Sequence, residues 1–154
     1  MTEERFQKYY KGLNTKLNHI INLLKDRSTD MQVDEGENLL PNFPLRTVQE
    51  FEEFQENLVT SLELQKLYIH EIKMIGGSDP GKCTRATLRF FISNEVALKY
   101  SWSGQKNTRN FRETLISQLI VETISKIKSV TKNDIEIIIK KWLQHASDRL
   151  KSKN

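Results

Sequence analysis

Apolar side chains recur every three or four positions from residue 3 to residue 25, which is the spacing of one face of an α-helix. The sequence therefore predicts an amphipathic helix over residues 1–25. The stripe also approaches three heptads, so it fits a short homodimeric coiled coil as well as packing back onto the rest of the chain. The residues expected to mediate oligomerisation are Phe6, Tyr10, Leu13, Leu17, Ile20 and Leu24.

Residues 26–39 have many acidic and small polar positions and no helical spacing of apolar residues. This composition predicts a flexible acidic linker. Residues 40–150 then carry enough helical segments for one folded domain, and residues 151–154 form a basic tail. The expected organisation is an amphipathic helix, a linker, a domain and a tail.

Capping residues and apolar spacing locate the helices of the domain. Thr47 with Glu50, and Thr131 with Asp134, have the three-residue spacing of capping boxes. The glycine pair at 76–77 ends a helix, because its first member can adopt the left-handed backbone of a C-cap. These signals predict an all-α fold, a compact bundle of about five helices with a separate N-terminal helix. The helices are expected over residues 47–56, 62–75 and 83–92, and from an N-cap at Asn94 to Tyr100, with a break near 57–60 and a loop over 101–110. Two more are expected over 111–126, where the β-branched content leaves a strand as the alternative, and from a cap at Thr131 to Lys151.

Composition narrows the functional classes. The N-terminus is charged and lacks the apolar stretch of a secretory signal, and no run of about 18 apolar residues occurs. We therefore expect an intracellular protein with no membrane span. The single cysteine, Cys83, excludes an intrachain disulfide and cannot form a zinc site alone, so we expect it to be a buried structural residue.

The sequence lacks the motifs of common enzyme classes. It has no nucleophile elbow, no dinucleotide-binding glycine pattern and no histidine pair at zinc-ligand spacing. The glutamates between Glu50 and Glu56 share one helix, where solvation is more typical than acid–base work. We therefore predict a non-enzymatic protein with no catalytic residue, no metal, no cofactor and no small-molecule substrate.

Charge is distributed unevenly along the chain. Residues 1–75 hold 9 basic and 13 acidic residues, a net charge of −4, whereas residues 76–154 hold 15 and 7, a net charge of +8. This asymmetry is typical of a half that contacts a phosphate-rich or acidic partner. It also occurs where lysines only keep helix faces solvated.

The loop over residues 103–110 joins small hydroxyls, amides, Gly104 and two cations ahead of a helix, so it could grip phosphate oxygens or simply be a polar surface loop. Tyr100 and Trp102 beside it either stack on bases or belong to the core, whereas the spacing of Trp142 places it in the core. The two cations of this loop, Lys106 and Arg109, are the residues that would contact phosphate in the first case.

Four separated motifs in order resemble the family of domains of unknown function numbered 4806 (DUF4806), over roughly residues 40–150. The resemblance implies a domain extent and no activity. The motifs are Leu45-x-Thr47-x-x-x-Phe51-x-x-Phe54, Ile75-Gly76-Gly77-Ser78, Asn94-Glu95-x-Ala97-x-x-Tyr100-Ser101-Trp102-x-Gly104 and Ile139-x-x-Trp142-Leu143-x-His145-Ala146.

The order of elements after Asn94 is also similar to the second half of a BEN domain, an all-helical module that binds DNA or chromatin partners. The resemblance implies that the late basic helix and the 103–112 loop approach DNA. The residues it predicts to contact nucleic acid are Lys106, Arg109 and Arg112 of the loop and Lys132, Lys140, Lys141, His145 and Arg149 of the late helix. The chain departs from the BEN pattern at residues 110–113, which read Asn-Phe-Arg-Glu where a Leu-Asp-Pro turn is usual.

Two functional hypotheses follow. In the first, the basic half binds double-stranded DNA or chromatin in the nucleus, and the N-terminal helix forms a homodimer. In the second, the chain is a protein-interaction or oligomerisation module without nucleic-acid binding, and its lysines only maintain solubility. Salt separates them, because phosphate contacts weaken steeply as salt rises and a helix–helix interface changes little.

Overall fold

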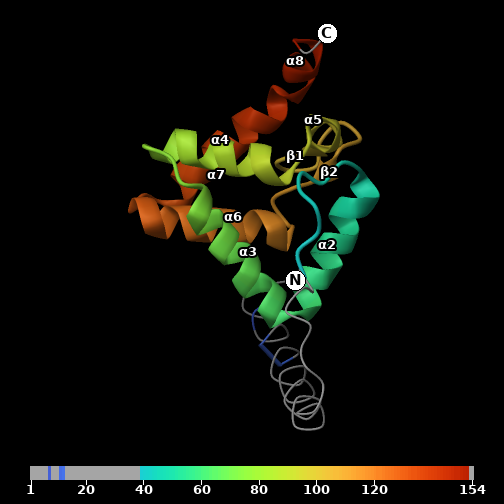
Figure 1. Ribbon diagram of the computed structural model, residues 1–154. Coiled ribbons are helices and arrows are strands. Elements are labelled where there is room, and N and C mark those ends of the chain that lie inside the picture. The colour runs from blue at the N-terminus through green and yellow to red at the C-terminus, as the bar shows by residue number, and fades with distance from the viewer. Residues whose placement is uncertain (1–6, 8–10, 13–38, 153–154) are drawn as a thin grey trace.

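The computed structural model describes residues 7, 11–12 and 39–152, and this part of the chain is mostly helical, which confirms the predicted all-α class (Figure 1). The predicted oligomerisation residues Phe6, Tyr10, Leu13, Leu17, Ile20 and Leu24, and all of the predicted linker except Leu39, lie outside the described residues. The described part has seven helices where about five were expected. They are α2 (Val48–Thr60), α3 (Leu62–Ile75), α4 (Pro80–Phe91), α5 (Asn94–Ala97), α6 (Leu115–Lys128), α7 (Lys132–Gln144) and α8 (Ala146–Lys151), with short strands β1 (Tyr100–Ser101) and β2 (Arg109–Asn110).

Helix α2 begins as predicted and ends later. The Thr47 hydroxyl accepts a hydrogen bond from the Glu50 amide at 3.1 Å, which confirms the N-cap. The Glu50 carboxylate accepts from the Arg46 amide at 2.7 Å, one residue before the position that a capping box requires. The helix continues past Glu56 to Thr60, and Ser61 then separates it from α3 and caps that helix.

Helix α4 starts earlier than the apolar spacing indicates. Asp79 caps it by accepting from the Lys82 amide at 2.8 Å, and Pro80 occupies the first turn, where its missing N–H costs nothing. The prediction that Asn94 caps the next helix is wrong, because the Ser93 hydroxyl accepts from the Val96 amide at 3.2 Å. This helix, α5, ends at Ala97 and not at Tyr100.

The segment predicted as a loop, 101–110, contains a strand pair. Tyr100 pairs with Arg109 and Ser101 with Asn110 in a parallel ladder. The amide of Phe111 donates to the carbonyl of Ser101 at 2.9 Å, so the backbone of Phe111 belongs to this ladder and cannot start a helix. Helix α6 therefore begins at Leu115 and not at 111.

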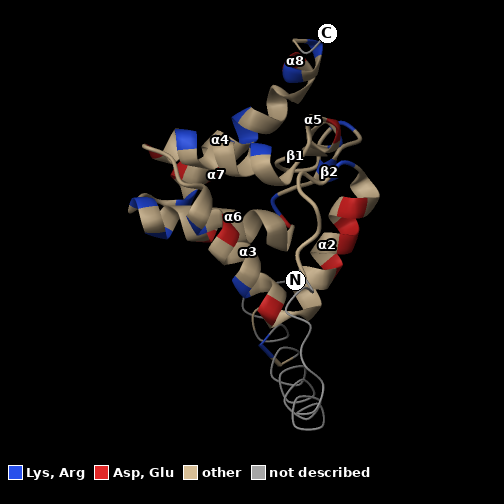
Figure 2. Ribbon diagram, viewed as in Figure 1, with Lys and Arg blue, Asp and Glu red and all other residues tan. Residues whose placement is uncertain are grey.

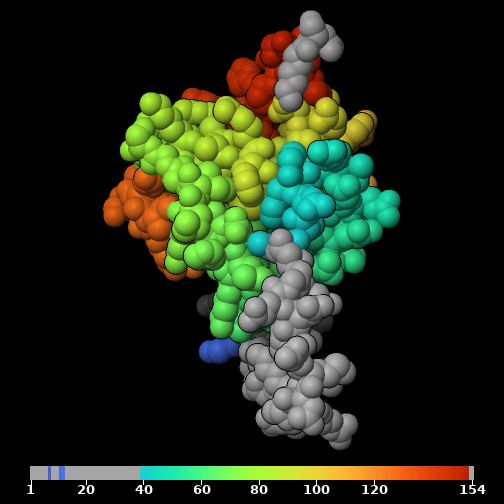
Figure 3. Space-filling model, in the orientation of Figure 1, coloured from blue at the N-terminus to red at the C-terminus, as the bar shows by residue number. Residues whose placement is uncertain are grey.

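The core forms where α6 packs against α2, α3, α4 and α7. The Tyr68 hydroxyl donates to the Ile116 carbonyl at 3.1 Å, tying α3 to α6. Cys83 and Trp142 are buried as expected. The extended segment before α2 also packs here, because Leu45 exchanges backbone hydrogen bonds with Phe91 and Ser93. Its cyan residues abut the yellow end of α4 in the space-filling view (Figure 3).

The predicted capping box of the last helix is complete. The Asp134 amide donates to the Thr131 hydroxyl and the Thr131 amide donates to the Asp134 carboxylate, each at 3.1 Å. The prediction of one helix as far as Lys151 is wrong, because α7 ends at Gln144 and α8 starts after His145. The chain changes direction there and brings α8 against α5.

Candidate functional site

Opposite charges occupy different elements of the domain. Helix α2 exposes a run of carboxylates, Glu50, Glu52, Glu53 and Glu56. Lysine and arginine gather on α4, α8 and the C-terminal end of α6, as Figure 2 shows, and α7 adds Lys140 and Lys141. A polyanion would therefore be attracted to the side of the domain away from α2.

A hollow of about 300 Å³ lies between the β1–β2 connection and the helices α7 and α8. We call it the loop–α7 hollow. Lys106 from the connection and Lys140 from α7 both line it, so two cations predicted from the sequence meet here. Its apolar lining comes from Leu98, Tyr100, Trp102 and Leu143, and its uncharged polar lining from Ser101, Ser103, Gln105, Thr108, Gln144 and Ser147.

The lining has no carboxylate among the described residues that form it. Lys106 and Lys140 also form no ion pair or side-chain hydrogen bond within residues 39–152. Their charges are therefore uncompensated. The hollow offers hydrogen-bond donors and positive charge beside aromatic surface, a combination suited to a phosphorylated ligand.

The β1–β2 connection is held by its own hydrogen bonds. Lys106 and Asn107 have φ angles of 53° and 62°, and the Thr108 amide donates to the Gln105 carbonyl at 3.1 Å across them. Two consecutive positive φ angles closed by this bond are characteristic of a type I′ turn. The Gln105 amide also donates to the Ser101 hydroxyl at 2.9 Å. The connection thus presents Lys106 from a fixed turn.

Gly104 permits the connection to fold over β2. Its φ is 74°, and a Cβ at this position would lie 3.1 Å from the Cβ of Asn110. A larger residue would be strained by the backbone and crowded by the strand. The glycine singled out in the sequence therefore has a structural role beside the hollow.

Tyr100 is neutral over a wide pH range. Burial, with a smaller contribution from the charge of Glu52, raises the pKa of its phenol to about 12. Its hydroxyl therefore stays protonated at neutral pH, and Tyr100 adds no negative charge beside the hollow.

This pKa predicts a loss of stability in alkali. An unfolded tyrosine releases its proton near its ordinary pKa of 10.0, whereas folded Tyr100 retains it to about 12, so unfolding releases a proton in this window. The free energy of unfolding should fall as pH rises from 10 to 12. In urea unfolding, the free energy of unfolding of Tyr100→Phe should fall less over this pH range than that of the wild type, each compared with its own value at neutral pH. Parallel curves for the two proteins would contradict the assignment.

Arg112 and Lys132 lie at a second hollow, of about 670 Å³. Three carboxylates, those of Glu113, Glu122 and Glu136, share its lining. The two predicted cations are therefore opposed by nearby negative charge and form a weaker anion site than the loop–α7 hollow. Trp102 lines both hollows and so lies between them.

Arg109 does not point freely to solvent. Its guanidinium forms an ion pair with Glu52 of α2, and both side chains are about half exposed. The pair compensates the charge of Arg109 and links β2 to the acidic helix.

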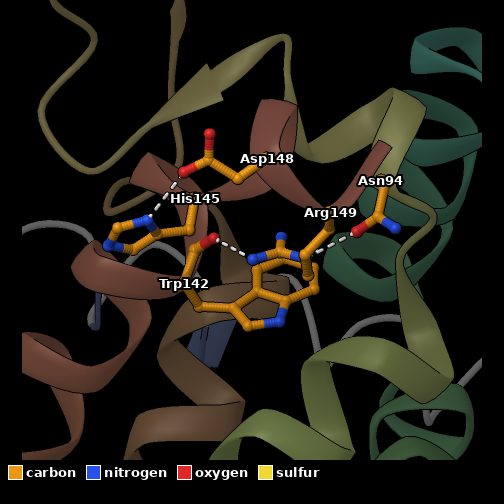
Figure 4. Close-up of polar contacts among 5 residues, drawn as sticks. All are labelled: Asn94, Trp142, His145, Asp148 and Arg149. Atoms are coloured by element: carbon orange, nitrogen blue, oxygen red, sulfur yellow. Dashed lines mark hydrogen bonds and ion pairs between the residues drawn. The ribbon is translucent and has the colours of Figure 1, made fainter. Parts of the chain in front are cut away.

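Arg149 is bound within the domain (Figure 4). Its Nε donates to Asn94 Oδ1 at 2.8 Å, its Nη1 donates to the Trp142 carbonyl at 2.7 Å, and its guanidinium carbon lies 4.0 Å from the centre of the Trp142 ring. Burial and, to a lesser degree, the charge of Arg89 lower the pKa of Arg149 from its ordinary value. Through these contacts Arg149 of α8 connects α5 and α7.

The remaining predicted residues are exposed. Lys141 follows Lys140 on α7 but does not line the loop–α7 hollow. His145 lies at the junction of α7 and α8, with its Nδ1 3.1 Å from Asp148 Oδ2. The structure thus places Lys106 and Lys140 at one hollow, and Lys141 and His145 follow Lys140 along the chain. Arg109 and Arg149 are instead bound to other residues of the domain.

Sequence reasoning missed a basic stripe on α4. Lys82, Arg85 and Arg89 are all exposed, at steps of three and four residues that place them along one face of the helix. The same spacing is readable in the sequence. The apolar residues of this segment predict its helix, but they do not indicate that its exposed face is basic.

Other site classes find no support in the described part of the chain. No group of three or more His, Cys, Asp or Glu side chains among those residues is placed to hold a metal ion. None of the described helices combines the length and the hydropathy needed to cross a membrane.

Comparison with known proteins gives one match. A family model described as a domain of unknown function (DUF4806) matches residues 40–127, more than half of the chain. No curated protein and no solved structure matches.

Proposed function

The chain belongs to the DUF4806 family of domains of unknown function, and we propose that it is a non-enzymatic nuclear domain that binds duplex DNA through its basic C-terminal half. One observation carries this proposal. Lys106 and Lys140 both line a hollow that has no carboxylate among its described lining residues, and Lys141 follows Lys140 on α7.

Phosphate binding is what this surface fits best. Lysine ammonium groups act as mobile point charges that can follow a row of phosphates. Contacts of this kind orient a protein on a duplex and supply affinity without reading the base sequence. The proposal therefore concerns backbone contacts, for which uncompensated charge is the main requirement.

Substituting the two α7 lysines tests the proposal. Lys140→Ala with Lys141→Ala should weaken binding of the full chain to a duplex of arbitrary sequence, measured by fluorescence anisotropy over a range of salt concentrations. Each lost phosphate contact should reduce the slope of log K against log salt by about 1, so a reduction of about 2 is expected.

A matched variant controls for net charge. Lys66→Ala with Lys73→Ala removes the same charge from exposed positions of α3. It should retain the wild-type slope. Equal loss in both variants would mean that only net charge matters, and would contradict a specific surface on α7.

Absence of binding even at low salt would reject the DNA proposal. The chain would then be a candidate for the alternative function, a protein-interaction or oligomerisation module. The residues predicted to form a homodimer lie outside the described part, so the dimer stays a prediction that sedimentation of the full chain can check.

A further inference from the structure

We propose that the loop–α7 hollow receives one unpaired nucleotide of the bound nucleic acid, with its base against Trp102 and its phosphate between Lys106 and Lys140. This inference rests on the proposed function and deepens it. It predicts a preference for duplexes that carry an unpaired nucleotide, at an overhang, a gap or a bulge, over fully paired ones.

The size of the hollow supports a single nucleotide. At about 300 Å³ it matches the lower end of the range for small-molecule pockets. A paired base cannot enter it, because its edge is joined to its partner and its faces are stacked. An unpaired base has already lost these interactions and avoids the cost of being extracted from the helix.

The aromatic side of the hollow provides a stacking surface. Trp102 is partly buried, and its ring packs beside that of Phe111 with centroids 6.5 Å apart, so its position is supported from the core. Leu98 is 40% exposed and lines the same hollow, so it extends the apolar surface beside Trp102. A base stacked on Trp102 would cover both side chains.

The polar side of the hollow offers hydrogen-bond donors, and no carboxylate among the described lining residues competes with a phosphate for them. Thr108 is already bonded to Ser101 within the connection. The side chains of Ser103, Gln144 and Ser147 make no hydrogen bond within the described residues, and with the two lysines they remain available to a phosphate or a base edge. Every lining residue is therefore either apolar, neutral and polar, or positive.

Three duplexes of identical core sequence test the inference. One is blunt, one carries a short single-stranded overhang, and one carries the same overhang with abasic sites, which keep the phosphates and lack the bases. The full chain should bind the overhang duplex about tenfold tighter than the other two at equal salt, since base–aromatic stacking typically contributes this much.

Two Trp102 variants assign the preference. Trp102→Leu should abolish the preference for the overhang over the blunt duplex, whereas Trp102→Phe should retain most of that preference because a stacking face remains. Tryptophan emission gives a second readout. The chain has two tryptophans, and Trp142 is only 4% exposed. Emission that is quenched by the overhang duplex and not by the blunt duplex therefore reports on Trp102.

The outcomes separate this inference from the proposed function. Equal binding of all three duplexes, with unchanged emission, overturns the nucleotide site and leaves duplex binding intact. Equal binding of the natural and abasic overhangs also overturns it, because phosphates alone would then suffice. Failure to bind any of the duplexes rejects both proposals together.

Discussion

Gly77→Ala is expected to lower the free energy of unfolding by about 3 kcal/mol, as the sum of backbone strain and overpacking. Gly77 has a φ of 153°, and a Cβ built on it would lie 2.6 Å from both the amide nitrogen and the Cα of Cys83. These are backbone atoms in the first turn of α4, so they cannot rotate away. The variant must shift α4 relative to α3, and urea unfolding followed by circular dichroism measures the cost.

Gly81→Ala is the matched control. It lies in the first turn of the same helix, where the three atoms nearest to an added Cβ belong to the side chains of Arg85 and Asp79. Alanine in a helix is also favoured over glycine. Its stability should stay at or slightly above that of the wild type. Equal stability of the Gly77→Ala protein would show that the chain between α3 and α4 can move freely.

The glycine pair at 76–77 shows which features of this fold can be predicted from neighbouring residues and which cannot. The glycine pair predicts the end of α3, and Gly76 does have a positive φ, 69°. Its ψ of −172° lies outside the left-handed region expected for a C-cap, in a region that essentially only glycine occupies. The lack of room for a Cβ at Gly77 depends on how the chain turns from α3 into α4 and brings Cys83 beside it, which the glycine pair alone does not reveal.

The start of a helix was predictable where a single threonine hydroxyl caps it. Thr47 and Thr131 cap the helices they were assigned to, because a cap depends only on residues within one turn. The end of α2 depends on more. The side chain of Gln65 donates to the Leu58 carbonyl at 2.8 Å, which satisfies a group at the end of α2 from the next helix. Such support extended the helix beyond its expected end.

The candidate site was predictable as a set of cations and not as a surface. The basic half of the sequence contains both Lys106 and Lys140, but their meeting depends on the strand pair that folds the 102–108 connection toward α7. A ladder of two residues has no periodicity to detect. The same limit explains Arg109, whose ion pair with Glu52 joins residues far apart in the chain.

Arg149→Ala is expected to lower the free energy of unfolding by about 2 kcal/mol, because it removes two charge-assisted hydrogen bonds and a stacked guanidinium. It would leave Asn94 Oδ1 and the Trp142 carbonyl without these donors and weaken the attachment of α8 to α5 (Figure 4). Thermal unfolding and the emission of Trp142 should both change.

Lys151→Ala provides the comparison, since it removes an equal charge from an exposed position of the same short helix. It should leave stability unchanged. Measured where both proteins are fully folded, Arg149→Ala should bind duplex DNA about as well as Lys151→Ala, because the guanidinium is committed to internal partners. Wild-type stability combined with a loss of binding equal to that of the α7 double variant would instead make Arg149 a direct contact, as the sequence predicted. A residue that stabilises the fold changes the free energy of unfolding when it is substituted, whereas a residue that contacts the ligand changes the affinity for duplex DNA.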